Sequence, residues 1–287
     1  MPRARIFILT TLTLMAFAGN SLLCRAALRD TQIDAASFTL IRLLAGALVL
    51  WLVVQLRRTK ATGNGSWLSA LSLFTYAATF SFAYISLPAA TGALLLFGAV
   101  QVTMIGHGLW RGERLLRLEF IGIVVAFAGL VGLLLPGLSA PPLVGSMLML
   151  AAGIAWGVYS LRGKSEGNPM QVTAGNFMRA VPIAIILSVI TLQHTVLDKA
   201  GVGYAIASGA ITSGLGYTIW YMVLPSLKAT SAATMQLTVP VIAAVGGILL
   251  LGEAMTLRLV LSAIAILGGI ALVNYEKQHT GINKPRE

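Results

Sequence analysis

TVPVIAAVGGILLLGEAMTLRLVLSAIAILGGIALV, residues 238–273, contains two apolar runs that are separated by the polar pair Gly252-Glu253. The runs belong to apolar segments at 229–251 and 256–274, and neither alternates polar with apolar residues as a strand would. The hydrocarbon core of a bilayer is about 30 Å thick and takes about 20 apolar residues per helix. A helix also satisfies its own backbone hydrogen bonds, which lipid cannot do. This stretch therefore predicts two helices that cross a membrane one after the other.

The composition extends this prediction to the whole chain. Of the 287 residues, 57% are hydrophobic and only 10% are charged, and the mean hydropathy is +0.86. A soluble protein carries about 25% charged residues, so the apolar excess here must face lipid. We expect an all-α integral membrane protein with ten transmembrane helices. The predicted spans are 4–23, 35–56, 67–86, 89–109, 118–135, 142–161, 173–193, 201–223, 229–251 and 256–274.

The basic residues set the expected orientation. If the N-terminus is cytoplasmic, fourteen of the 20 Lys and Arg residues lie inside, four lie outside and two lie within spans. Cytoplasmic loops are enriched in Lys and Arg, so both termini are expected in the cytoplasm. The same bias explains the net charge of +11, which does not indicate nucleic acid because no basic face is interleaved with aromatic residues. Ala16-Phe17-Ala18 resembles a signal-peptide cleavage site, but we expect the first span to be retained.

Landmarks recur at a nearly constant spacing along the chain, which indicates an internal repeat. A gap of three residues near Lys228 accounts for the change in spacing between the earlier and later landmarks. The recurring pairs lie 137 to 140 positions apart and are Arg42 and Arg179, Leu87-Pro88 and Leu224-Pro225, Ala18-Gly19 and Trp156-Gly157, Gly112-Glu113 and Gly252-Glu253, and Gly129 and Gly269.

The two repeats are expected to cover residues 1–137 and 138–276, followed by a cytoplasmic tail at 277–287, and to form one structural domain. Each contains five spans, an odd number, so the second repeat crosses the membrane in the opposite sense. Inverted repeats are typical of secondary transporters, whose substrate site lies near the midplane between the repeats and whose halves rock to alternate access. Ten spans can enclose one pathway, so we expect a monomer.

The chain resembles the drug/metabolite transporter superfamily, of the EamA type, in three features. These are the ten spans, the internal duplication, and the Gly-Glu pair that ends spans four and nine. The most specific part is Thr238-Val239-Pro240-Val241, followed by Leu251-Gly252-Glu253 and Gly268-Gly269, whereas the first half has Val100 in place of Pro240. The whole sequence is also similar to bacterial YddG-type exporters of aromatic amino acids. This resemblance implies alternating-access export of phenylalanine, tryptophan and tyrosine across the bacterial inner membrane. Export of other amino acids, or proton-coupled export of hydrophobic drugs, is the alternative.

Polar or aromatic side chains near mid-span are the candidates for substrate contact. Aromatic rings can stack on an aromatic substrate, the faces of Tyr and Trp attract an ammonium group, and Asn and Gln amides can hydrogen-bond a carboxylate. The same rings could instead serve helix packing or lipid contact. The candidates are Asn20, Tyr76, Phe80, Tyr84, Gln101, Trp156, Tyr159, Phe177, Tyr217 and Gln236.

Few charges lie inside the predicted spans. Arg42 and Arg179 are either gate residues at opposite mouths or basic side chains that snorkel to the interface, and His107 is a third intramembrane candidate, for a gate or for a buried capping role. All nine acidic residues lie at span ends, in loops or in the tail, with Glu113 and Glu253 expected in salt bridges or helix caps. Proton-coupled pumps use embedded carboxylates or histidines. We therefore expect uncoupled export, or coupling through groups that the sequence does not identify.

Gly98 and Pro240 occupy matching places in spans four and nine and are the predicted hinges, because proline breaks a helical hydrogen bond. One cysteine, Cys24, cannot form an intramolecular disulfide or a cysteine zinc site. Gly163-Lys164-Ser165 resembles the end of a phosphate-binding loop, but Val158 stands where that loop needs glycine. We expect neither an enzyme nor a cofactor or metal; a membrane-embedded enzyme without a visible catalytic motif is the remote alternative. The expected partners are a small-molecule substrate and lipid.

Overall fold

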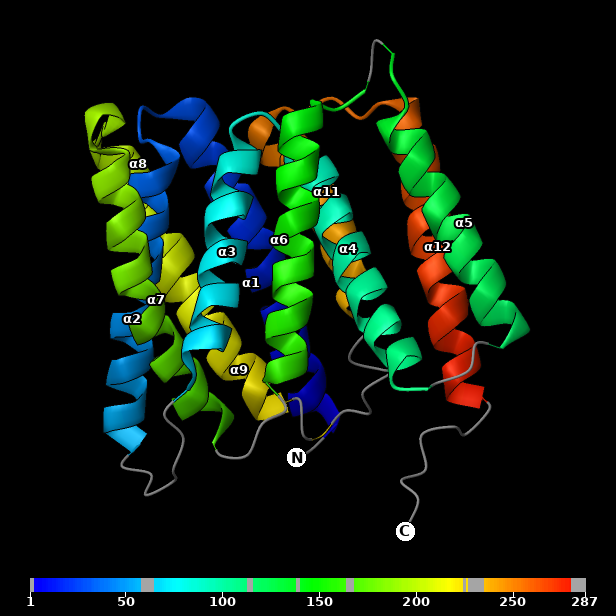
Figure 1. Ribbon diagram of the computed structural model, residues 1–287, viewed down its shortest axis with the longest axis horizontal. Helices are drawn as coiled ribbons and strands as arrows, with labels where there is room; N and C mark the ends of the chain where they lie inside the picture. The colour runs from blue at the N-terminus through cyan, green and yellow to red at the C-terminus, as the bar shows by residue number, and fades with distance from the viewer. Residues whose placement is uncertain are drawn as a thin grey trace.

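The computed structural model describes residues 3–57, 65–112, 116–137, 140–163, 168–223, 226 and 235–279, and this part of the chain is a bundle of helices (Figure 1). The first five are α1 (Arg3–Asp30), α2 (Ala35–Arg57), α3 (Trp67–Tyr84), α4 (Ala89–Trp110) and α5 (Arg117–Leu134). The rest are α6 (Leu143–Arg162), α7 (Pro169–Ile190), the short 3-10 turn η1 (Leu192–His194), α8 (Lys199–Ala207), the π-helix η2 (Ser208–Leu215), α9 (Gly216–Val223), α11 (Thr238–Leu251) and α12 (Leu257–His279).

The predicted all-helical fold is confirmed. In the described residues α8, η2 and α9 follow one another without a break and form the eighth crossing, so the elements make ten crossings. By length and composition, α1, α2, α4, α5, α6 and α7 could each span a bilayer, and α11 and α12 contribute shorter apolar segments. Most boundaries fall within a few residues of the predicted ones, because the apolar runs and the turn residues between them are both visible in the sequence.

Two predicted boundaries need correction. The first helix does not end near residue 23 but continues to Asp30, so that Arg25 and Arg29 lie on its last turns. In the ninth span the helix is interrupted at Leu237, one turn before Pro240, whose nitrogen cannot donate to the carbonyl oxygen of Gln236. The predicted landmarks Glu113 and Leu224-Pro225, and the tail beyond residue 279, lie outside the described residues.

Short polar residues begin several of the helices. The Asp34 carboxylate accepts the backbone N–H groups of Ala36 and Ser37, which cap α2, and the Ser66 hydroxyl accepts that of Ser69 at the start of α3. Asp198 caps α8 in the same way by accepting the N–H of Gly201, and this hydrogen bond lowers the pKa of the Asp198 carboxyl. These caps satisfy N–H groups that a helix end would otherwise leave without partners.

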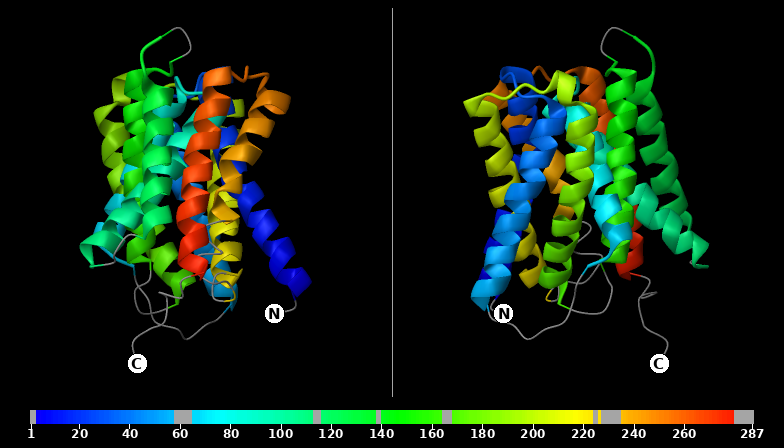
Figure 2. Two further views of the ribbon diagram at one scale, coloured as in Figure 1. Left: turned by 90° about the vertical axis from the view of Figure 1, so that its right-hand side faces the viewer. Right: turned by 60° about the vertical axis from the view of Figure 1, so that its left-hand side comes forward.

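The packing of the helices follows the predicted inverted repeat. α1 begins on the face of the bundle at which α12 ends, whereas α6 begins on the opposite face (Figure 1). Three pairs of equivalent helices pack on each other: α2 with α7, α4 with α11, and α5 with α12. The third span of each repeat instead packs on the first span of the other repeat. In this way α3 contacts α6, and the crossing formed by α8, η2 and α9 contacts α1. The α5–α12 pair stands at one end of the bundle (Figure 2). The repeat boundary at 137–138 stays a prediction.

Glycines allow α2 and η2 to cross at close range. A Cβ atom at Gly209 would overlap the carbonyl oxygen of Arg42 and lie 2.9 Å from the Cβ of Ala45. On α2, a Cβ atom at Gly46 would lie 3.2 Å from the carbonyl oxygen of Gly209. Small residues at a crossing are the common device by which membrane helices come into contact. Here they bring the π-helix directly against the middle of α2.

We predict that Gly209→Ala destabilises the fold by about 1–3 kcal/mol, because the added methyl group must displace the α2 backbone. The matched control is Gly203→Ala in α8, where a Cβ atom would have no neighbour within 4 Å. Unfolding in detergent, followed by intrinsic fluorescence, measures both variants. Equal transition temperatures for Gly209→Ala and Gly203→Ala would contradict the close crossing.

Candidate substrate site

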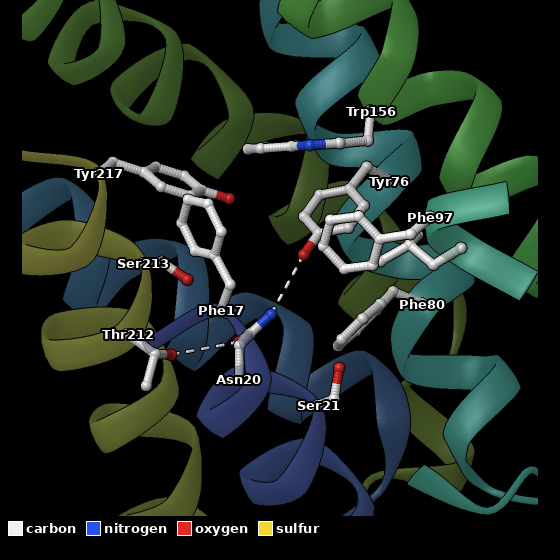
Figure 3. Close-up of a pocket in the computed structure, with 11 residues that line it drawn as sticks. Phe17, Asn20, Ser21, Tyr76, Phe80, Phe97, Trp156, Thr212, Ser213 and Tyr217 are labelled. Carbon is white, nitrogen blue, oxygen red and sulfur yellow. Dashed lines mark hydrogen bonds between the residues drawn. The ribbon is translucent and has the colours of Figure 1, made fainter. Parts of the chain in front are cut away.

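A small cavity lies inside the bundle where α1, α3, α4 and α6 meet η2 and α9 (Figure 3). Its volume is about 20 Å³, which is room for about one water molecule. Both repeats therefore contribute to its wall, as expected of a site between inverted halves. The lining residues are Phe17, Asn20, Ser21, Tyr76, Phe80, Leu96, Phe97, Trp156, Thr212, Ser213 and Tyr217.

Asn20 is the polar centre of this cavity. Its Nδ2 atom donates to the hydroxyl oxygen of Tyr76 at 3.1 Å, and its Oδ1 atom accepts from Thr212 at 3.3 Å (Figure 3). The same Oδ1 atom accepts from the Ser208 hydroxyl at 2.7 Å. One amide thus joins α1 to α3 and to the π-helix. A π-helix widens the turn by one residue and often occurs at functional sites. Here the widened turn holds Ser208 and Thr212 toward Asn20.

Aromatic rings form the opposite side of the cavity. The centroid of the Trp156 ring lies 4.9 Å from that of Tyr76 and 5.2 Å from that of Tyr217. Tyr76 and Phe80 are 5.3 Å apart, and the edge of Phe17 meets Tyr217 at 5.8 Å. In Figure 3 these rings face the space above Asn20. The cavity therefore has an apolar aromatic side and a neutral polar side.

Five of the ten predicted contact residues line the cavity, namely Asn20, Tyr76, Phe80, Trp156 and Tyr217. The signal that found them was the occurrence of polar or aromatic groups at mid-span in a chain made mostly of aliphatic residues.

The other five predicted residues lie elsewhere. Tyr159 and Phe177 stand behind the lining, 5.4 Å from Trp156 and 5.9 Å from Tyr217, respectively. Tyr84 is buried beyond Phe80, and its hydroxyl donates to the carbonyl oxygen of Ala89 at 3.3 Å. Gln101 lines a separate apolar groove between α4, α5 and α12, and half-buried Gln236 is not among the lining residues.

The sequence prediction missed Phe17, Ser21, Phe97, Thr212 and Ser213, which also line the cavity. A helical spacing connects some of them to predicted residues, because Phe17, Asn20 and Ser21 follow the i, i+3, i+4 pattern of one helix face. The π-turn that brings Thr212 and Ser213 inward has no comparable signal in the sequence.

The predicted charged and hinge residues occupy different surroundings. Arg42 is buried to 2% exposure beneath the rings of Phe38, Tyr76 and Phe80. Arg179 is half-buried, and its Nη1 atom donates to the carbonyl oxygen of Gly175 at 3.1 Å.

His107 is half-buried in the last turn of α4. Gly98 and Pro240 line the two apolar grooves beside α4, of about 220 and 360 Å³. The gate and hinge roles of these residues stay predictions.

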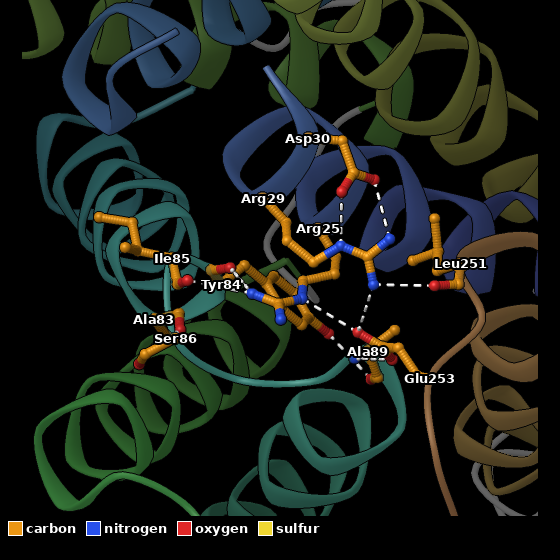
Figure 4. A network of polar contacts seen from close by, with 10 residues as sticks. All are labelled: Arg25, Arg29, Asp30, Ala83, Tyr84, Ile85, Ser86, Ala89, Leu251 and Glu253. Carbon is orange, nitrogen blue, oxygen red and sulfur yellow. Dashed lines mark hydrogen bonds and ion pairs between the residues drawn. The ribbon is translucent and has the colours of Figure 1, made fainter. Parts of the chain in front are cut away.

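A cluster of charges joins the repeats at the end of the bundle where α1 terminates (Figure 4). Arg25 donates from Nε to the Glu253 carboxylate at 3.0 Å, and its Nη1 donates to the carbonyl oxygens of Tyr84 and Ile85 at 2.9 and 3.0 Å. The side chains of Arg25 and Glu253 are only 12% and 9% exposed. The predicted salt bridge of Glu253 is thereby confirmed, and it ties α1 and the end of α3 to the loop after α11.

Glu253 also caps a helix, but not the one that follows it in sequence. Its second carboxylate oxygen accepts the backbone N–H of Ala89 at 2.8 Å, at the first turn of α4. A carboxylate is favoured there by the helix dipole. Gly252 makes this possible, because it ends α11 in the left-handed conformation (φ 62°) and turns Glu253 back toward α4.

Comparison with known proteins agrees with this architecture. Residues 143–275 match the EamA-like transporter family. The chain is 56% identical over 256 residues, 89% of each chain, to Uncharacterized protein PA1977 of Pseudomonas aeruginosa, and 25% identical over 264 residues to an uncharacterized transporter of Archaeoglobus fulgidus. The chain belongs to the EamA-like transporter family, within the drug/metabolite transporter superfamily.

Further relatives bear on this EamA-like transporter. Over 145 residues, 48% of each chain, it is 33% identical to the Threonine/homoserine exporter RhtA of Salmonella typhimurium. A crystal structure superposes with a TM-score of 0.68 over 97% of this chain and 99% of that chain at 15% identity, which supports the fold alone. The chain is therefore a multi-pass membrane transporter and not an enzyme.

The buried ion pair yields a quantitative prediction. In a double-mutant cycle of Arg25→Gln and Glu253→Gln, we expect a coupling free energy of about 1–3 kcal/mol, because each single variant leaves a poorly solvated charge. The control is the cycle of Arg29→Gln and Asp30→Asn, a pair on the same helix whose side chains are 32% and 44% exposed. Because solvent screens this pair, we expect its coupling free energy to be about 0.5 kcal/mol or less. Unfolding equilibria in mixed micelles measure both cycles, and similar couplings would contradict a special role for Arg25–Glu253.

Proposed function

We propose that this EamA-like transporter exports small neutral amino acids through the Asn20 cavity by alternating access, with both termini in the cytoplasm. The observation that supports this most directly is the two-sided lining. Aromatic rings suit an apolar side chain, while the Asn20 amide and the hydroxyl groups beside it can hydrogen-bond the carboxylate and ammonium of an amino acid.

Within this class we propose an aromatic amino acid as the substrate. The ring centroids of Tyr76 and Tyr217 lie 4.9 and 5.2 Å, respectively, from that of Trp156, within the range in which aromatic groups interact favourably. A second candidate is a hydroxylated amino acid, because a relative that matches 48% of this chain is a threonine/homoserine exporter and because Thr212 and Ser213 line the cavity. The two candidates differ in whether the aromatic rings or the hydroxyl groups of the cavity lining select the side chain of the substrate.

The size of the cavity supports alternating access. A space of about 20 Å³ holds no amino acid, so the helices must separate to admit one. The Arg25–Glu253 cluster closes the bundle at the end where α1 terminates, which the distribution of basic residues assigns to the outer face. Opening of that face requires these contacts to break.

We propose export without proton coupling by a monomer. The described carboxylates lie at helix ends or in loops, outside the cavity lining, and the cavity is built within one chain.

The test is uptake of radiolabelled tryptophan into proteoliposomes that contain only this protein. We expect saturable uptake that phenylalanine inhibits and that an imposed pH gradient leaves unchanged. Trp156→Ala should raise the half-saturating concentration about 2- to 10-fold through lost ring contact. Trp110→Ala is the control, because Trp110 is 89% exposed at the end of α4.

Other outcomes separate the alternatives. Inhibition by threonine and homoserine but not by phenylalanine would favour the hydroxylated substrate. Stimulation by the pH gradient would refute uncoupled export. Absence of uptake of all these amino acids by folded protein would refute the amino acid assignment, while the family and fold would stand.

A further inference from the structure

Arg42 is a buried cation beside the cavity. Its side chain is among the largest that the fold buries completely, and its Nη1 atom has no hydrogen-bond partner in the described residues. The central carbon of its guanidinium lies 5.1 Å from the centroid of the Phe80 ring, 5.6 Å from that of Tyr76 and 5.9 Å from that of Phe38. The charge is therefore held by ring faces.

The described carboxylates are engaged elsewhere, at the ends of helices. Asp34, Asp198 and Glu119 accept backbone N–H groups at the starts of α2, α8 and α5. Asp30 is paired with Arg29, and Glu253 with Arg25. In the part of the chain that the structure describes, no ion pair involves Arg42.

Arginine keeps its proton in proteins, so this positive charge persists. A buried charge is costly unless it is paired, and the attraction of ring faces offsets only part of that cost. A residue of this kind inside a membrane bundle is usually functional. The close α2–η2 crossing at Gly209 also holds the backbone of Arg42 in place.

The position of Arg42 connects it to the cavity. Tyr76 and Phe80, whose rings hold the guanidinium, also line the cavity that Asn20 centres. In a surrounding of low dielectric constant, a charge that is separated from the cavity only by these two rings acts strongly on a molecule in the cavity. The potential favours a carboxylate there and disfavours an amine that has no carboxylate.

We propose that Arg42 is the charge-selectivity residue of the transport site, so that the cavity accepts molecules bearing a carboxylate and rejects organic cations of the same shape. This proposal rests on amino acid export as the function. It assigns to Arg42 a role through the field it creates across the Tyr76 and Phe80 rings, rather than the gate role predicted from its sequence position.

The test compares two indole competitors of tryptophan uptake in proteoliposomes. Indole-3-propionate keeps the carboxylate and lacks the amine, and tryptamine keeps the amine and lacks the carboxylate. For the natural chain we expect the half-inhibitory concentration of tryptamine to exceed that of indole-3-propionate about tenfold or more. Arg42→Gln should bring this ratio close to one, and Arg42→Lys, which keeps the charge, should preserve most of it.

The control variant is Arg258→Gln, which removes a cation at the start of α12 whose Nη1 atom contacts the carbonyl oxygen of Leu135. It should leave the inhibition ratio unchanged. Equal inhibition of the natural chain by both competitors would overturn the proposal without any variant, even if Arg42→Gln failed to fold. An unchanged ratio in folded Arg42→Gln would also overturn it.

The proposed function can fail separately from the role of Arg42. If threonine is transported in place of tryptophan, the matched pair is 3-hydroxybutyrate and 1-aminopropan-2-ol, and the same ratios apply. Transport of neither amino acid refutes amino acid export, and the selectivity proposal falls with it. Transport of either one with equal inhibition by acid and amine refutes the role of Arg42 alone.

Discussion

A polar group inside a bilayer must find its partner within the protein, and this constraint governs where the polar side chains of the chain lie. The described carboxylates remain at helix ends, where backbone N–H groups and arginines satisfy them. In the interior the hydrogen bonds are those of neutral groups, chiefly the Asn20 amide with Tyr76 and with the hydroxyls of η2. Because these bonds join α1, α3 and η2, the group that gives the cavity its polarity also holds its walls together.

Close helix packing also determines where the functional candidates lie. Gly209 and Gly46 allow η2 to meet α2, and this contact places Arg42 behind the rings that line the cavity. At the end of the bundle, the left-handed Gly252 turns Glu253 toward both Arg25 and the first turn of α4. The interior is thus tightly packed around a space for about one water molecule. Under the proposed export mechanism, whole helices rather than single side chains must move to admit a substrate.

The Arg25–Glu253 ion pair lies at the end of the bundle where α1 terminates, between the two predicted repeats. α1 belongs to the first predicted repeat and α11 to the second, so a contact between the end of α1 and the loop after α11 joins the two. A carboxylate shared by an arginine and a helix N-terminus is favourable when its partners stay in place. Under the proposed alternating access, these contacts would break together when that face opens.

The sequence by itself determined the helical membrane fold, the number of crossings and most of their ends, because apolar runs of about 20 residues have one stable solution in lipid. It also indicated Asn20, Trp156 and Tyr217, which line the cavity, since polar and aromatic groups are conspicuous in such runs; their contact with a substrate stays a prediction. Only the tertiary structure decided that Tyr84 and Gln101 lie away from the cavity, that η2 turns Thr212 and Ser213 into it, and that Arg42 is buried under rings. The physical reason is that the rotation of each helix about its axis depends on close contacts such as Gly209 on Arg42, which join residues far apart in the sequence and leave no local pattern.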